Sequence, residues 1–181
     1  MNNSFKSLFK NDIFLNKIIS KKCFVINKPN SFYKSVNGKN KIKKFLELNK
    51  SQKFFIHFKL SKYDKLIDKF LKQNNFKLIE RNEIYEKKNK TVLNIKKIKF
   101  LKIRLARSID KNMISNIAQK NFKFSRFHKD KLISNYYANK IKKNWIENYF
   151  YGKRGDELII AELDKKIVGF LLLIKIKKCI F

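Results

Sequence analysis

The sequence predicts an α/β protein in which a small N-terminal domain precedes a second, mixed α/β domain. Apolar residues recur at helical spacing in several segments, for example over residues 64–71. A short run over residues 54–60 places alternate side chains on opposite faces, as a strand does. Near the end, two apolar runs are separated by only three residues, 164–166, and so short a connection permits only an antiparallel hairpin.

The first domain is expected to begin with an irregular segment that ends at Asn37-Gly38. A short amphipathic helix then extends to about Lys50, and a strand follows over residues 54–60. Ser61-Lys62-Tyr63-Asp64 is close to a capping box for a second helix, which Asn74-Asn75 would close in the left-handed conformation.

A second strand is predicted over residues 76–85, so the strand, helix and strand would form a crossover unit. The charged turn over residues 86–90 is the best domain boundary that the sequence offers. We therefore expect an N-terminal α/β domain over residues 1–95 and a second domain over residues 96–181.

The second domain is expected to start with a strand over residues 98–106 and a helix capped by Asp110 or Ser108. A longer helix should follow, with a buried stripe of residues spaced by four, and should end at two glycines. The stripe is Ile133, Tyr137, Ile141, Trp145 and Tyr149, and the glycines are Gly152 and Gly155. The closing hairpin would pair residues 156–163 with residues 167–176, and the second strand, apolar on both faces, should be covered.

The charge of the chain is extreme, at +31, but only five of the 45 basic residues are arginine. Arginine binds phosphate oxygens with two parallel hydrogen bonds, and here the lysines are spread along the whole chain. Specific nucleic-acid binding is therefore disfavoured.

Two isolated cysteines, Cys23 and Cys179, match no metal or redox spacing, and no apolar run is long enough for a signal peptide or a membrane helix. We expect a cytoplasmic protein without a bound metal and without membrane contact.

One polar segment carries the candidate site residues Ser125, Arg126, Phe127, His128 and Asp130, and the following helix adds Asn148. The string Ser-Arg-Phe-His-x-Asp, followed by a Trp and an Asn three residues apart, resembles TDP-fucosamine acetyltransferases of the GNAT superfamily. In that family the acceptor is dTDP-4-amino-4,6-dideoxygalactose. The similarity covers most of the chain and is weakest over the first forty residues.

The resemblance implies a small N-terminal α/β domain followed by the first strands and helices of an N-acetyltransferase domain. It implies transfer of an acetyl group from acetyl-CoA to the amine of a nucleotide-linked amino sugar. The six candidate residues would bind the sugar nucleotide, while no catalytic residue is assigned. The glycine-rich loop that holds acetyl-CoA in the family has no counterpart among Gly38, Gly152, Gly155 and Gly169. We therefore expect a truncated domain that does not acetylate by itself.

Structural roles for the same residues remain open. Ser125 and Asp130 would then be turn or cap residues, Arg126 a surface cation and Phe127 a core residue. Asn148 could face the acceptor or cap the helix end. Trp145 is expected to fill the core, and His57 to be an ordinary surface histidine or a satisfied one. The alternative function is a non-catalytic lysine-rich α/β module that binds nucleic acid or a partner protein. A homo-oligomer is compatible with either function.

Overall fold

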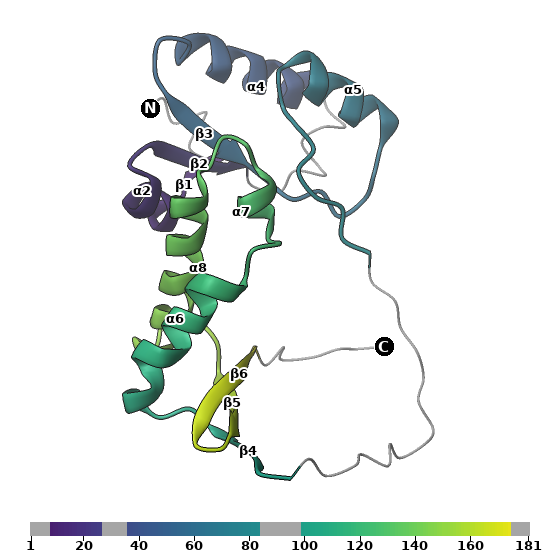
Figure 1. The fold of residues 1–181 in the computed structure, drawn as a ribbon. Helices are drawn as coiled ribbons and strands as arrows, with labels where there is room; N and C mark the ends of the chain where they lie inside the picture. Colours follow the sequence, from purple (N-terminus) through teal and green to yellow (C-terminus); the bar gives the residue numbers. More distant parts are fainter. Residues whose placement is uncertain (1–7, 27–35, 84–98, 175–181) are drawn as a thin grey trace. The chain divides into compact units, whose positions relative to one another are not determined.

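The computed structural model describes residues 8–26, 36–83 and 99–174 (Figure 1). The chain forms two compact units, unit 1 (Met1–Ile79) and unit 2 (Glu80–Phe181). Both units combine helices with a small sheet, which confirms the α/β class. The predicted charged turn over residues 86–90 and the predicted boundary at residues 95/96 lie outside the described residues.

Unit 1 contains a three-stranded sheet in the order β1-β2-β3, in which β1 and β2 are antiparallel and β2 and β3 are parallel. Its elements are β1 (Phe9–Asn11), α2 (Ile13–Ile19), β2 (Lys22–Ile26), α4 (Val36–Leu48), β3 (Phe54–His57) and α5 (Lys65–Gln73). The expectation of an irregular opening segment was wrong, because three elements precede α4. They are short, so none spans enough residues for a clear periodic pattern.

The crossover that joins parallel strands lies one element earlier than predicted. Helix α4 connects β2 to β3, whereas residues 76–83, expected to be a strand, are not in a sheet. Asn75 does adopt the left-handed conformation after α5, with a φ of 61°. The cap at the other end is Asp64 and not Ser61, because its Oδ1 accepts the amides of Leu66 and Ile67 at 2.8 and 3.1 Å.

The core of unit 1 consists of aromatic and aliphatic side chains from the sheet, α4 and α5. Phe45 stacks on Phe9 with ring centroids 3.9 Å apart. His57 lies on β3 and contacts Asp12 at 2.8 Å, while Asp12 also accepts the Leu15 amide as the N-cap of α2. The expectation of a satisfied histidine is confirmed.

Unit 2 contains an antiparallel sheet in the order β4-β5-β6, and its helices lie between β4 and β5 along the chain. Its elements are β4 (Leu101–Leu105), the 3-10 turn η1 (Ser108–Asp110), α6 (Lys111–Asn121), α7 (Arg126–Lys129), α8 (Asn135–Phe150), β5 (Glu157–Leu163) and β6 (Lys166–Leu173). The predicted hairpin is confirmed. Asp164 and Lys165 turn the chain with positive φ values of 49° and 63°, as tight hairpin turns require.

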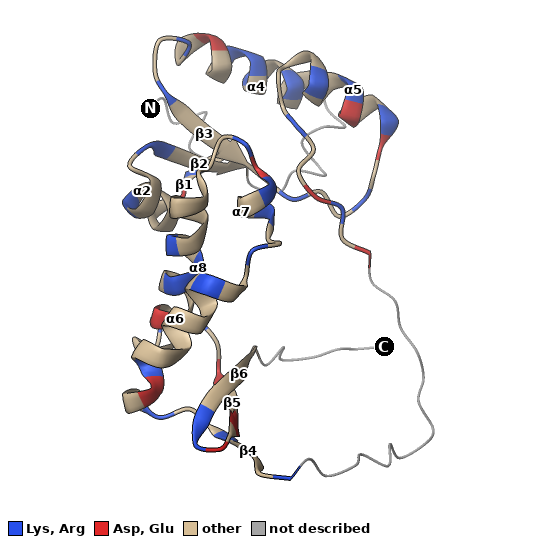
Figure 2. Ribbon diagram, in the orientation of Figure 1, with Lys and Arg blue, Asp and Glu red and all other residues tan. Residues whose placement is uncertain are grey.

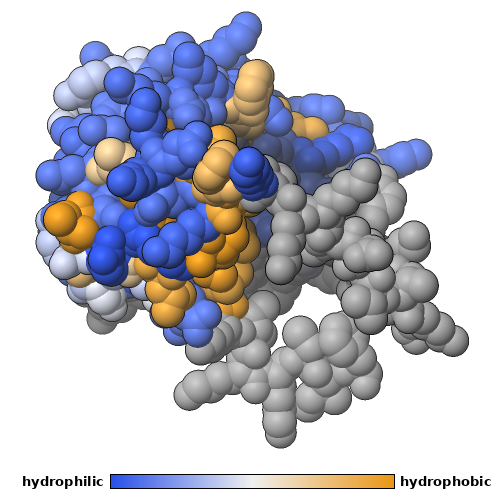
Figure 3. Space-filling model, turned by 60° about the horizontal axis from the view of Figure 1, so that its bottom comes forward, coloured by the Kyte–Doolittle hydropathy of each residue, from blue (hydrophilic) through white to orange (hydrophobic). Residues whose placement is uncertain are grey.

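The two faces of the β4–β6 sheet differ in cover. Leu158 and Ile160 are fully buried in a cluster with Ile114 of α6 and Ile146 of α8. On the opposite face the register aligns apolar residues that stay exposed, including Ile103 at 60%, Leu105 at 58% and Leu171 at 56%. Among residues 8–26, 36–83 and 99–174, only one side of β6 is covered. Figure 3 shows exposed apolar side chains gathered amid hydrophilic surface.

The buried face of α8 differs from the predicted stripe. Ala138, Ile141 and Ile146 are its buried residues, whereas Tyr137, Trp145 and Tyr149 are half-buried. A spacing of four advances around the helix by slightly more than one turn, so such a stripe drifts away from a straight contact line.

None of the helices in the described ranges combines the length and hydropathy that crossing a bilayer needs.

Candidate functional site

Helix α7 holds the polar segment that the sequence singled out. The helix is a single turn, in which the His128 amide donates to the Ser125 carbonyl at 2.9 Å and the Asp130 amide donates to the Arg126 carbonyl at 3.1 Å. Residues three apart in a helical turn lie on the same side. The turn therefore brings the side chains of Ser125 and His128 together.

A chain of hydrogen bonds runs from Ser125 through His128 to Asn139. Ser125 Oγ lies 2.8 Å from His128 Nδ1, and His128 Nε2 lies 2.9 Å from Asn139 Oδ1 on α8. Because an amide oxygen only accepts, this network assigns the ring proton to Nε2. In the neutral ring Nδ1 then accepts a hydrogen bond from the Ser125 hydroxyl, so the imidazole is oriented as a base next to a hydroxyl.

Arg126 and Phe127 lie against aromatic surface. Phe127 is 4% exposed and meets Trp145 edge to face, with ring centroids 5.5 Å apart at 78°. The Arg126 guanidinium carbon lies 4.7 Å from the centroid of the Phe127 ring. Phe127 thus has the structural role that the sequence left open, and its ring contacts both Trp145 and the Arg126 guanidinium.

Asp130 is a turn residue between α7 and α8. Its side chain is 8% exposed and accepts the Leu132 amide at 2.9 Å, while its carbonyl accepts the Ile133 amide at 3.0 Å. The carboxylate is thus engaged by the backbone of the connection. Asp130 therefore positions the start of α8. No described contact joins its side chain to Ser125 or His128.

Asn148 lies away from the Ser125–His128–Asn139 chain. It is half-buried, and its carbonyl accepts the Lys153 amide at 2.8 Å where α8 ends. Nine residues separate it from Asn139, which corresponds to roughly 14 Å along a helix axis. The structure therefore brings Ser125, His128 and Asn139 together and places Asn148 at the helix end.

Sequence reasoning missed three residues near α7. Asn139 had no signal, since a lone asparagine in a helix is ordinary. Lys142 Nζ and the Arg154 guanidinium carbon each lie 4.5 Å from the Trp145 ring centroid. A signal existed for Lys142, because a lysine three residues before a tryptophan in a helix lies on the same side.

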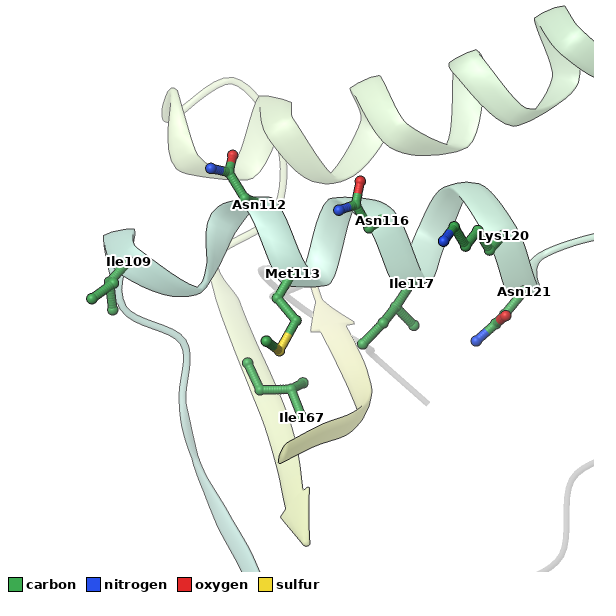
Figure 4. Close-up of a pocket in the computed structure, with 8 residues that line it drawn as sticks. All are labelled: Ile109, Asn112, Met113, Asn116, Ile117, Lys120, Asn121 and Ile167. Atoms are coloured by element: carbon green, nitrogen blue, oxygen red, sulfur yellow. The ribbon is translucent and has the colours of Figure 1, made fainter. Parts of the chain in front are cut away.

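A separate groove of about 510 Å³ lies along α6 (Figure 4). Met113 and Ile117 point from α6 toward Ile167 on β6, whereas Asn112 and Asn116 point away from that strand. The groove also takes in residues at both ends of α6, namely Ile109, Lys120 and Asn121. None of the predicted site residues lines it, so the groove and the α7 site are distinct features.

Basic side chains are distributed over the helices of both units (Figure 2). Among the residues that the structure describes, no group of three or more His, Cys, Asp or Glu side chains could hold a metal ion. No protein-family model matches the chain, and comparisons with curated proteins and with solved structures found no match.

Proposed function

We propose that the chain provides the acceptor-binding part of an N-acetyltransferase, which moves an acetyl group from acetyl-CoA to the amine of a nucleotide-linked amino sugar. The observation that carries the proposal is the hydrogen-bond chain Ser125–His128–Asn139. It supplies an oriented base of the kind that amine acylation requires.

An amino sugar is an ammonium ion near neutral pH and must lose a proton before it attacks a thioester. The proposed path takes that proton to Ser125 Oγ while the serine proton moves to His128 Nδ1. Asn139 Oδ1 stabilises the imidazolium through Nε2–H. The amine nitrogen then bonds to the acetyl carbon, and the carbon–sulfur bond breaks with its electron pair going to sulfur. The second amine proton passes to that sulfur, so coenzyme A leaves as the thiol.

The element order of unit 2 supports the same proposal. The elements of unit 2 follow the order in which the acetyltransferase domain of the similar enzymes begins. That order is one strand, two helices and two antiparallel strands, here β4, α6, α8, β5 and β6. Element order alone is shared by many α/β proteins. The side chains on α7 therefore carry more weight than the order.

Binding of the acceptor tests the proposal directly. Acetyl transfer is not a suitable measurement, because the resemblance assigns no acetyl-CoA site to this chain. Calorimetric titration with dTDP-4-amino-4,6-dideoxygalactose is expected to show saturable binding. Ser125→Ala and His128→Gln should each weaken it by about tenfold, the equivalent of one lost hydrogen bond to a charged group. Ser134→Ala is the matched control, because Ser134 is exposed and its side chain makes no cap hydrogen bond.

Absence of saturable binding by the folded wild-type chain would contradict the proposal. The same holds if Ser134→Ala weakens binding as much as Ser125→Ala does. Retention on nucleic acid with preference for a defined sequence would instead favour the alternative, a non-catalytic lysine-rich module.

A further inference from the structure

Three cations gather around one pair of aromatic rings in unit 2. Helix α8 presents Lys142 and Trp145 one turn apart, and Lys142 Nζ lies 4.5 Å from the Trp145 centroid and 6.0 Å from that of Phe127. The guanidinium of Arg126 covers the Phe127 ring at 4.7 Å. Cations over ring faces are held electrostatically by the ring quadrupole.

The third cation reaches the rings because of how α8 ends. Gly152 adopts a φ of +66°, and the Lys153 amide then donates back to the Asn148 carbonyl at 2.8 Å. This reversal brings the Arg154 guanidinium carbon to 4.5 Å from the Trp145 centroid. The arrangement is therefore built by a helix, its terminating turn and α7 together.

Lys142 interacts electrostatically with both arginines. The pKa of Lys142 is lowered, first by burial and then by the positive charges of Arg126 and Arg154. Glu80 opposes this shift, but it also forms an ion pair with Lys129, with Lys129 Nζ 3.2 Å from Glu80 Oε1. Cations gathered at this density favour an added anion, because its charge relieves their mutual repulsion.

We propose that Arg126, Lys142 and Arg154, held over Phe127 and Trp145, form a binding site for a diphosphate group. Two guanidinium groups over rings whose centroids are 5.5 Å apart suit a ligand with more than one phosphoryl group, and Lys142 adds a third positive charge close to both rings. This site would bind the diphosphate of the nucleotide sugar in the proposed function. The identity of that ligand rests on the proposed function.

Trp145 makes the test direct, because it is the only tryptophan of the chain. Inorganic pyrophosphate does not absorb where tryptophan is excited, so it can be titrated against Trp145 emission, with calorimetry as an independent measurement. We expect saturable binding that weakens by about tenfold for Lys142→Met and for Arg154→Gln, as loss of one charged contact implies. Titrations with dTDP and with coenzyme A distinguish the two nucleotide sources of a diphosphate.

Lys143→Met is the matched control, because it removes the same charge from the neighbouring position, where Lys143 pairs with Glu147 at 4.0 Å. Binding to this variant should stay within about twofold of wild type, since surface pairs contribute little. Equal weakening by Lys142→Met and Lys143→Met would mean diffuse attraction to a highly charged chain and would overturn the inference. Absence of saturable binding in both measurements would also overturn it.

The two proposals fail separately. If pyrophosphate binds with the expected variant pattern while the amino sugar nucleotide does not bind more tightly than dTDP, the diphosphate site stands and the acceptor assignment falls. If the amino sugar nucleotide binds and its affinity depends on His128 but not on Lys142 or Arg154, the diphosphate site is wrong and the proposed function stands.

Discussion

Asp110→Asn tests the ion-pair network that ties β4 to α6 and β5. The Asp110 carboxylate accepts both terminal nitrogens of Arg104, at 2.7 and 3.0 Å, and the Arg107 amide at 2.7 Å. Arg104 also donates to Glu162 at 3.0 and 3.1 Å. Asparagine keeps the shape of the side chain but removes the negative charge between the strand and the helix.

The magnitude follows from the pKa of Asp110. The hydrogen bonds from Arg104 lower it from its ordinary value of 3.8 to about 2, burial opposes the shift, and the Arg107 amide assists it. A shift of this size would correspond to about 2.5 kcal/mol without solvent screening. Because water reaches this network in part, we expect a loss of about 1–2 kcal/mol in the free energy of unfolding of unit 2 at pH 7.

The same pKa fixes the pH dependence. The folded value lies below the unfolded one, so the Asp110 carboxylate contributes its full stabilisation above about pH 4. This contribution is lost as the pH falls from about 4 to about 2. Wild type and Asp110→Asn should therefore differ at pH 7 and converge near pH 2.

Urea unfolding followed by tryptophan emission measures this difference, because Trp145 is the only tryptophan and lies in unit 2. Asp164→Asn is the control, since Asp164 is an exposed turn residue with a φ of 49°, which asparagine tolerates. If Asp110→Asn loses stability between pH 4 and pH 2 in parallel with wild type, the network is not the source of the pH dependence.

Three further predictions concern packing in unit 2, all measured by the same urea unfolding. Gly155→Ala should destabilise by about 2–3 kcal/mol and Gly152→Ala by only about 1; both have positive φ, but an added Cβ meets a leucine side chain of β6 at 2.5 Å only at Gly155. Ser115→Ala should stabilise by about 0.5–1 kcal/mol, because the buried hydroxyl has no partner among the described residues. Ile160→Ala should cost about 3 kcal/mol and Ile103→Ala less than about 1, since they are 0% and 60% exposed. Equal effects within either pair, or a destabilised Ser115→Ala, would contradict this packing.

Elements whose geometry is fixed locally were predictable from the sequence. A three-residue connection between two apolar strands leaves only an antiparallel hairpin, and β5 and β6 form one. The parallel pair of β2 and β3 was missed, because β2 is five residues long and its partner lies beyond a whole helix. No periodicity within a segment reveals which distant strand it joins.

Asp110 shows how a local interpretation can name the right residue and only part of its role. The sequence predicted that Asp110 or Ser108 caps the helix. The Asp110 side chain makes no cap hydrogen bond at the start of α6, but it accepts the Arg107 amide in a capping box at the start of η1. It also binds Arg104, which reaches Glu162 because β4 and β5 pair in a register that makes Arg104 and Glu162 diagonal neighbours. Strand register is a tertiary property, so composition and spacing could not reveal this network.

The same distinction between local sequence information and tertiary packing applies to the candidate site. Ser125 and His128 both belong to the polar segment that the sequence singled out. Their pairing depends on the single turn of α7, which the sequence did not predict, and Asn139 enters only through the packing of α7 against α8. The charge excess adds a second lesson, since lysines spread over a solvated surface attract anions without selecting among them. Burial beside Trp145 lowers the pKa of Lys142, and its charge lies close to those of two arginines. If this site selects its anion, the selectivity must come from that fixed arrangement, because the net charge of the chain changes equally when any one lysine is removed.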